Sequence, residues 1–159
     1  MLVAQACRNH GSIAIILADL DKFKQVNDIY GHIIGDAALR NFAVTCQENL
    51  RSQDILGRYG GDEFVIILPD VNTSKAVELA ERLRHAVKSM KLVAGERKIT
   101  VTASFGIVSV QNEVSIDLVT LINYADEALY EAKKAGGNQV YVFNTKSGVE
   151  LLSTDWRVN

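Results

Sequence analysis

Residues 58–64 read Arg-Tyr-Gly-Gly-Asp-Glu-Phe, and residues 60–63 of this stretch separate two short apolar runs, residues 54–59 and 64–68, which we expect to be strands. Glycines tolerate positive φ between two strands, so this pattern predicts a β-hairpin with two acids at its tip. An ordinary tight turn favours Asn-Gly or Asp-Gly, whereas here two glycines precede two adjacent acids. Phosphate oxygens can approach glycine backbone closely, and carboxylates beside them suit a hard cation such as Mg²⁺.

A second pair of acids lies upstream of this hairpin. Residues 12–20 are short and rich in Ile and Leu, which predicts a buried strand, and this strand ends with Asp19 and then Asp21. A strand-end carboxylate beside a hairpin carboxylate could hold one or two Mg²⁺ ions against a triphosphate. The alternative for each pair alone is that the acids are solvated, as is usual at strand ends and turns.

The remaining periodicity predicts helices alternating with strands. A cap at Asn72 or Thr73 should begin the third helix, and Gly136-Gly137 should end the last one. The expected elements are helices over residues 22–30, 36–50, 73–90 and 115–135, and strands over residues 98–110 and 139–143. Residues up to Asn9 are compatible with the end of a helix. This order favours an α+β fold with a central, mostly antiparallel sheet of about five strands, surrounded by helices.

Length and charge limit the class of protein. The 159 residues suit a single domain over residues 1–159, and the net charge of −2 gives no basic surface for duplex nucleic acid or an anionic membrane. The longest apolar run, residues 13–18, is too short to span a bilayer, and no signal peptide is apparent. Cys7 and Cys46 form neither a disulfide framework nor a zinc pattern. We therefore expect a cytoplasmic domain whose own segment makes no membrane contact.

The hairpin string Gly-Gly-Asp-Glu-Phe resembles the signature of the GGDEF diguanylate cyclases. Further blocks match that family in order and cover residues 12–143. They are residues 19–28 with Gly31-His32 and Gly35-Asp36, residues 102–106 (Thr-Ala-Ser-Phe-Gly) and residues 125–133. The resemblance implies the nucleotidyl-cyclase, polymerase-palm-like fold. It also implies that two GTP molecules condense to cyclic di-GMP with loss of two pyrophosphates, across a homodimer.

The resemblance assigns the acids to metal binding. Asp19 and Asp62 would coordinate Mg²⁺, or Mn²⁺ in its place, with the Leu20 carbonyl as a further ligand. Glu63 would either add to metal coordination or assist deprotonation of the 3′-hydroxyl, and the sequence does not separate these roles.

The resemblance also implies a substrate site with two parts. Asn27 and Asp36 would read guanine, since an Asp accepts from the guanine N1 and N2 hydrogens, a donor pair that adenine lacks. Phosphates would meet the hairpin glycines, a helix N-terminus and a late lysine: Gly60, Gly61, Phe23, Lys24 and Lys133. For Lys133 the alternative is a solvated lysine at a helix end.

Upstream of the hairpin, residues 51–54 read Arg-Ser-Gln-Asp. Their spacing from the hairpin matches the family's Arg-x-x-Asp inhibitory site, where cyclic di-GMP binds as product and inhibitor. Arg51 and Asp54 would bind it, and Arg82 would complete the site. The alternative is a salt bridge at a helix end.

One position departs from the family pattern, since Gly137 stands where an arginine usually contacts the γ-phosphate. The rival hypothesis is therefore a catalytically weak or inactive module that binds GTP or cyclic di-GMP and regulates a partner. A third is a cyclase or polymerase-palm relative that uses another nucleotide. Family members usually carry a helical lead-in and a sensor domain before the first strand. Neither feature is visible in the few residues before residue 12, so we expect this segment to lack both, and any membrane anchor to lie outside it.

Overall fold

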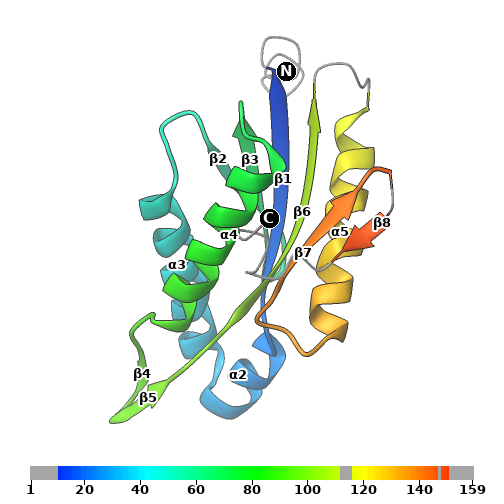
Figure 1. Ribbon diagram of the computed structural model, residues 1–159. Coiled ribbons are helices and arrows are strands. Elements are labelled where there is room, and N and C mark those ends of the chain that lie inside the picture. Colours follow the sequence, from blue (N-terminus) through cyan, green and yellow to red (C-terminus); the bar gives the residue numbers. More distant parts are fainter. Residues whose placement is uncertain (1–10, 112–115, 147, 151–159) are drawn as a thin grey trace.

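The computed structural model of the chain describes residues 11–111, 116–146 and 148–150, and it places the predicted hairpin strands at one edge of a six-stranded sheet (Figure 1). The strand order is β2-β3-β1-β6-β7-β8. These strands are β1 (Ser12–Leu20), β2 (Ile55–Gly60), β3 (Glu63–Pro69), β6 (Ala103–Gln111), β7 (Val140–Asn144) and β8 (Gly148–Glu150). Among the neighbouring strands of the described residues, only β6 and β7 pair in parallel, and the others are antiparallel. The predicted α+β fold with a mostly antiparallel sheet is therefore confirmed.

Strand β1 is the centre of the sheet and pairs with both β3 and β6. Its residues from Ile13 to Leu20 are all buried, which explains why an almost uninterrupted apolar run forms a strand here. The side chains divide between two cores because successive residues of a strand point to opposite faces. Ala14, Ile16, Ala18 and Leu20 belong to one core, and Ile13, Ile15 and Leu17 to the other.

Helices cover both faces of this sheet. On one face lie α2 (Phe23–Tyr30), α3 (His32–Asn49) and α4 (Thr73–Lys88), and on the other lies α5 (Leu118–Lys134). Asn72 caps α4, since its Oδ1 accepts a hydrogen bond from Lys75 N at 2.9 Å, and Asp117 caps α5 in the same way. The cap predicted at Asn72 or Thr73 is thus Asn72.

Gly106 sets how closely α5 approaches the sheet. A Cβ at this position of β6 would lie 2.1 Å from the Ala125 carbonyl oxygen and 2.3 Å from Leu129 N. Only glycine allows the two backbones to meet at this distance. The glycine therefore fixes the distance between α5 and the strand beside β1.

Several predicted boundaries were wrong. Helix α3 begins at His32 instead of near Asp36, because Gly31 with φ of 86° separates it from α2 and lets it start at once. The strand predicted over residues 98–110 is two strands: β5 (Arg97–Ile99) pairs with β4 (Leu92–Ala94) in a small hairpin, and β6 begins only at Ala103. Strands β4 and β8 were not predicted. The N-terminal helix end and Cys7 lie outside the described residues.

Candidate active site

Asp19 lies near the end of β1 and is only 4% exposed. Its Oδ2 forms an ion pair with the Lys133 ammonium, while its Oδ1 is buried without a hydrogen-bond partner. Burial, together with the neighbouring Asp62 carboxyl, raises the pKa of this carboxyl to about 7, against the lowering effect of Lys133. A buried carboxylate oxygen without a donor is costly, so this atom is a candidate ligand-binding atom.

The hairpin brings Asp62 and Glu63 to this buried acid. Asp62 lies near enough to Asp19 for its carboxyl to raise the Asp19 pKa, and Glu63 lies directly opposite Asp19 in the β1–β3 register. Directly opposed residues on antiparallel strands have side chains on the same face of the sheet. Asp19 and Glu63 therefore share the face covered by α5, and Asp62 lies near Asp19 at the hairpin turn.

The tip of the hairpin has its own support. The β2–β3 register shifts between Arg58 and Gly60, and the Arg58 guanidinium donates to the Gly61 carbonyl, at 2.8 Å from Nε. Gly61 has φ of 42°, as expected for glycine at a turn. Gly60 and Gly61 are exposed, so their backbone is open to a ligand.

Asp21, two residues beyond Asp19, has a different environment. Its carboxylate accepts hydrogen bonds from the Thr102 hydroxyl at 2.7 Å, the Ser104 hydroxyl at 2.6 Å and the Asn138 N–H at 2.7 Å. A Cβ on Gly137 would lie 2.8–3.0 Å from this carboxyl group. Asp21 therefore holds the chain segments that surround the site.

Asn27 and Asp36 lie on either side of the turn between α2 and α3. The Asn27 Oδ1 is buried without a hydrogen-bond partner, and it packs against Gly35, where a Cβ would lie only 1.7 Å away. Asp36 is exposed and lines a depression of about 430 Å³ together with Leu39, Arg40, Ala43, Arg58 and Phe64. The two residues predicted to read guanine are thus close in space, and one has a polar atom without a partner.

The predicted phosphate contacts come from separate elements. Phe23 and Lys24 form the start of α2, directly after Lys22 with φ of 54°, and Lys24 is exposed. Leu20 ends β1 with a buried side chain. Lys133 reaches the same region from the last turn of α5, where its ammonium pairs with Asp19 while the side chain stays 38% exposed.

Arg51, Asp54 and Arg82 all line a second depression of about 270 Å³, between the end of α3 and helix α4. The Asp54 Oδ2 accepts from Arg51 N at 2.8 Å and lies 3.6 Å from its Nε, whereas the Asp54 Oδ1 is buried without a partner. Arg82 donates to the Asn49 side chain and carbonyl at 3.2 Å. The salt bridge offered as the alternative is present, and it lies inside a cavity.

Asp19 has the chemistry of a ligand for a divalent cation, but the described side chains around it do not form a preformed metal site. Among residues 11–111, 116–146 and 148–150, no group of three or more His, Cys, Asp or Glu side chains is arranged to hold a metal ion. One Asp19 oxygen is paired with the Lys133 ammonium. The other oxygen, buried and without a donor, has the chemistry of a hard-cation ligand.

Sequence reasoning missed the residues that support the site. Ser104 is completely buried in β6, and a polar residue inside an apolar strand was the signal that could have found it. Arg58 was part of the quoted hairpin, yet its bond to the Gly61 carbonyl had no sequence signal. The same holds for Asn138, whose role depends on a turn.

Fold and site together define an α+β domain that carries acids on a β-hairpin beside a buried strand-end acid. The family model for the diguanylate cyclase GGDEF domain matches residues 1–139. The chain is 39% identical to diguanylate cyclase DosC of Escherichia coli K12 over 139 residues, and 40% identical to the response regulator PleD of Caulobacter vibrioides over 141 residues. The chain therefore belongs to the GGDEF diguanylate cyclase domain family.

Solved structures agree with this assignment. The active GGEEF domain of a diguanylate cyclase from Vibrio cholerae superposes with a TM-score of 0.82 at 29% identity, covering 90% of each chain. The GGDEF domain of DgcB from Caulobacter crescentus, solved in complex with c-di-GMP, superposes with a TM-score of 0.80 at 29% identity, covering 88% of this chain and 82% of that one.

The two curated relatives are much longer than this chain. Each match covers 87% of this chain, but only 30% of DosC and 31% of PleD. None of the helices in the described part of the chain is both long and apolar enough to cross a lipid bilayer.

Proposed function

We propose that this domain is a diguanylate cyclase, which condenses two GTP molecules into cyclic di-GMP and two pyrophosphates. The observation that carries the proposal is the buried Asp19 Oδ1, which has no partner and lies beside Asp62 and opposite Glu63. A domain selected only for stability would gain by replacing this acid. The relatives DosC and Diguanylate cyclase A of Treponema denticola are named for the same activity.

Asp19, Asp62, Glu63 and the Leu20 carbonyl would hold Mg²⁺ or Mn²⁺. When bound, the cation would lower the pKa of the 3′-hydroxyl and neutralise charge on the leaving pyrophosphate. Each 3′-oxygen would attack the α-phosphorus of the other GTP, so two P–O bonds form and two pyrophosphates leave. Glu63 would be either a metal ligand or the acceptor of the hydroxyl proton.

The remaining residues would bind and orient GTP. Asn27 and Asp36 would bind guanine, and the exposed Gly60 and Gly61 backbone would line the phosphates. The start of α2 at Phe23 and Lys24 would face further phosphate oxygens. Lys133 would pass from Asp19 to the terminal phosphate. Because one domain holds one GTP, catalysis requires a homodimer, at least during the reaction.

The first test is incubation with GTP and Mg²⁺, followed by chromatographic separation of the nucleotides. We expect cyclic di-GMP from the wild type and a loss of more than about 100-fold for Asp62→Ala, beyond the effect of residues that only orient a metal ligand. Glu96→Ala is the matched control, because this exposed acid lies at the β4–β5 turn. A concentrated, covalently linked dimer of the wild type that makes no cyclic di-GMP would refute the proposal.

Arg51, Asp54 and Arg82 would form an inhibitory product site. Their shared depression of about 270 Å³ and the partnerless Asp54 Oδ1 support this role, because guanine carries N–H donors and the product carries phosphates. We expect Arg51→Ala to weaken cyclic di-GMP binding by about 10-fold or more. Arg97→Ala, on the exposed β5, should have no effect. Unchanged product affinity in Arg51→Ala would exclude the site.

The second candidate function is nucleotide binding without turnover. Gly137 favours it, because the arginine of the family pattern is absent and a Cβ there would lie only 2.8 Å from the Asp21 carboxyl carbon. Such a module would bind GTP and cyclic di-GMP in calorimetry while the chromatographic assay shows no product. The buried Asp19 argues against it, since a receptor has no use for a costly acid beside Asp62.

A further inference from the structure

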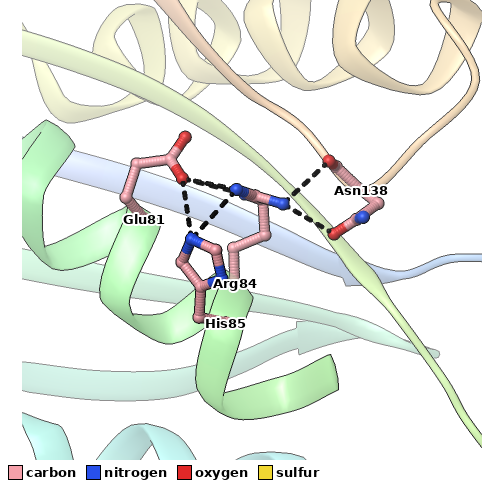
Figure 2. Close-up of polar contacts among 4 residues, drawn as sticks. All are labelled: Glu81, Arg84, His85 and Asn138. Carbon is pink, nitrogen blue, oxygen red and sulfur yellow. Dashed lines mark hydrogen bonds and ion pairs between the residues drawn. The ribbon is translucent and has the colours of Figure 1, made fainter. Parts of the chain in front are cut away.

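Arg84 on α4 is hydrogen-bonded to Asn138 in the turn between α5 and β7 (Figure 2), although α4 and α5 cover opposite faces of the sheet. Its Nη1 lies 3.2 Å from the Asn138 Oδ1 and 3.5 Å from the Asn138 carbonyl oxygen. Its Nε and Nη2 donate to the Glu81 carboxylate at 2.9 and 2.8 Å. Both side chains are mostly buried, at 17% and 16% exposed. Glu81 therefore fixes the plane of the guanidinium, and the remaining edge faces Asn138.

The turn that Arg84 contacts has an unusual backbone. Gly136, Gly137 and Asn138 have φ of 113°, 77° and 52°, three successive residues with positive φ. Hydrogen bonds from Gly136 N to the Lys133 carbonyl and from Gly137 N to the Ala132 carbonyl close the end of α5. Asn tolerates the left-handed region better than other residues with side chains, but still at a cost. A bond from outside the turn therefore helps to hold it.

Two parts of the candidate active site depend on this turn. The Asn138 N–H is one of three donors to Asp21, which follows β1. The turn also contacts Lys133: Gly136 N donates to the Lys133 carbonyl, and the Lys133 ammonium forms an ion pair with Asp19. Movement of the turn would consequently release a donor from Asp21 and shift the helix end that carries Lys133.

We propose that Arg84 is a positioning residue for the reaction, which fixes the α5–β7 turn so that Lys133 and Asp21 keep their places beside Asp19. This inference rests on the proposed cyclase function. Arg84 acts through Asn138, and nothing in its contacts requires it to touch substrate. His85, which lies 3.2 Å from the Arg84 Nη2 and is 69% exposed, adds contact on the solvent side.

Arg84→Met tests the proposal, since methionine has similar length but no donors. We expect kcat/KM for GTP to fall by about 10-fold or more, because charge-assisted hydrogen bonds are lost. Arg84→Lys should recover part of the activity, because an ammonium can reach one Asn138 oxygen while losing the fork. Lys88→Met, which removes an exposed cation four residues along the same helix, should match the wild type.

A second control separates positioning from general stability. Val87→Ala removes two methyl groups from a fully buried residue of α4. Assayed well below both melting temperatures, this variant should keep its activity to within about 3-fold. An Arg84→Met variant that behaves like Val87→Ala would overturn the proposal.

Hydrogen exchange of the wild type and variants gives a readout independent of turnover. In Arg84→Met we expect exchange at the Asn138 amide to accelerate by about 10-fold relative to the Ala80 amide in the middle of α4. Equal protection of Asn138 would overturn the proposal, even if activity fell. If the wild type makes no cyclic di-GMP, the cyclase proposal fails while this exchange result still reports whether Arg84 holds the turn.

Asn138→Gly completes the experiment. Glycine keeps the positive φ, the N–H to Asp21 and the carbonyl, but removes the Oδ1 that Arg84 contacts. If Arg84 acts through Asn138, combining the two substitutions should lower kcat/KM by less than the product of the single effects. Fully multiplicative effects would show that Arg84 acts by another route.

Discussion

Asp19 and Asp21 are two residues apart at the same end of β1, yet their surroundings are opposite. Asp21 accepts three hydrogen bonds of 2.6–2.7 Å and binds together three chain segments. Asp19 is buried beside another acid, with one oxygen unpartnered and a pKa raised to about 7 by burial. The first acid is satisfied within the fold and stabilises it. The second is left incomplete, as expected for a group whose partner arrives with substrate.

Asp19→Asn is the strongest test of the different roles that we assign to Asp19 and Asp21. We expect cyclic di-GMP formation to fall by about 10²–10³-fold, because the amide is a weaker ligand for a cation and carries no charge. The chromatographic assay measures the loss. Glu127→Gln, an equal change at an exposed position of α5, is the control. Retained activity in Asp19→Asn would mean that the Asp19 carboxylate takes no part in the reaction.

Asp21→Asn should act mainly on stability. The amide replaces one acceptor oxygen by a donor that faces hydroxyl or N–H groups, so we expect a loss of about 2–4 kcal/mol in the free energy of unfolding. Urea denaturation of the wild type and both Asp variants gives the comparison directly. A larger loss for Asp19→Asn than for Asp21→Asn would reverse the roles we assign.

The pH dependence of stability should also differ between the two acids. In the folded protein the pKa of Asp19 is about 7, against 3.8 for an ordinary Asp, so the folded state keeps a proton that the unfolded chain has lost between these values. The Asp19 contribution is thus complete below about pH 4 and is lost as pH rises through 7.

At pH 8 without divalent cations, Asp19→Asn should therefore exceed the wild type in stability by about 1–3 kcal/mol, reduced from the full shift because Lys133 is partly exposed. At pH 4 the two proteins should be nearly equal. Urea midpoints from pH 4 to 8 measure this difference. A wild type as stable as the variant at pH 8 would contradict the cost that we assign to burial.

A smaller effect, on KM for GTP, is expected at Asn27, whose Oδ1 has no hydrogen-bond partner and packs against Gly35. Gly35→Ala should displace Asn27, whose Oδ1 would lie 1.7 Å from the new methyl group, and raise KM for GTP by about 10-fold, or 1.4 kcal/mol. Gly57→Ala is the matched control, since its methyl would meet only Val65 at an ordinary 3.5 Å. Equal KM values for the two variants would remove Asn27 from the substrate site.

Much of the fold could be predicted from residues with a strong local signal. The apolar run of residues 12–20 gave the central strand with its observed bounds, and the glycine pair gave the hairpin. The β4–β5 hairpin was missed because residues 98–110 alternate continuously, and only tertiary pairing with Leu92–Ala94 divides them. The early start of α3 depends on the backbone of Gly31.

The candidate site shows the same division. The acids could be grouped from sequence because a strand end and a hairpin tip are local features. That Lys133 occupies an Asp19 oxygen could not be foreseen, since the pair spans 114 residues. The different hydrogen bonding of Asp19 and Asp21 could not be predicted either, because the donors to Asp21 (Thr102, Ser104 and Asn138) come from distant parts of the chain.

Gly106 has a consequence for how this domain can change over evolution. Leu129, whose backbone it touches, and Lys133 are four residues apart, so they lie on one side of α5 about one turn from each other. Deleting a single residue between them would rotate the lysine by about 100° around the helix, away from Asp19. An exposed side chain in this interval, such as that of Tyr130, can vary, but the number of residues cannot. The contact between Gly106 and Leu129 fixes the position of α5, and the number of residues after Leu129 then fixes the direction in which Lys133 points.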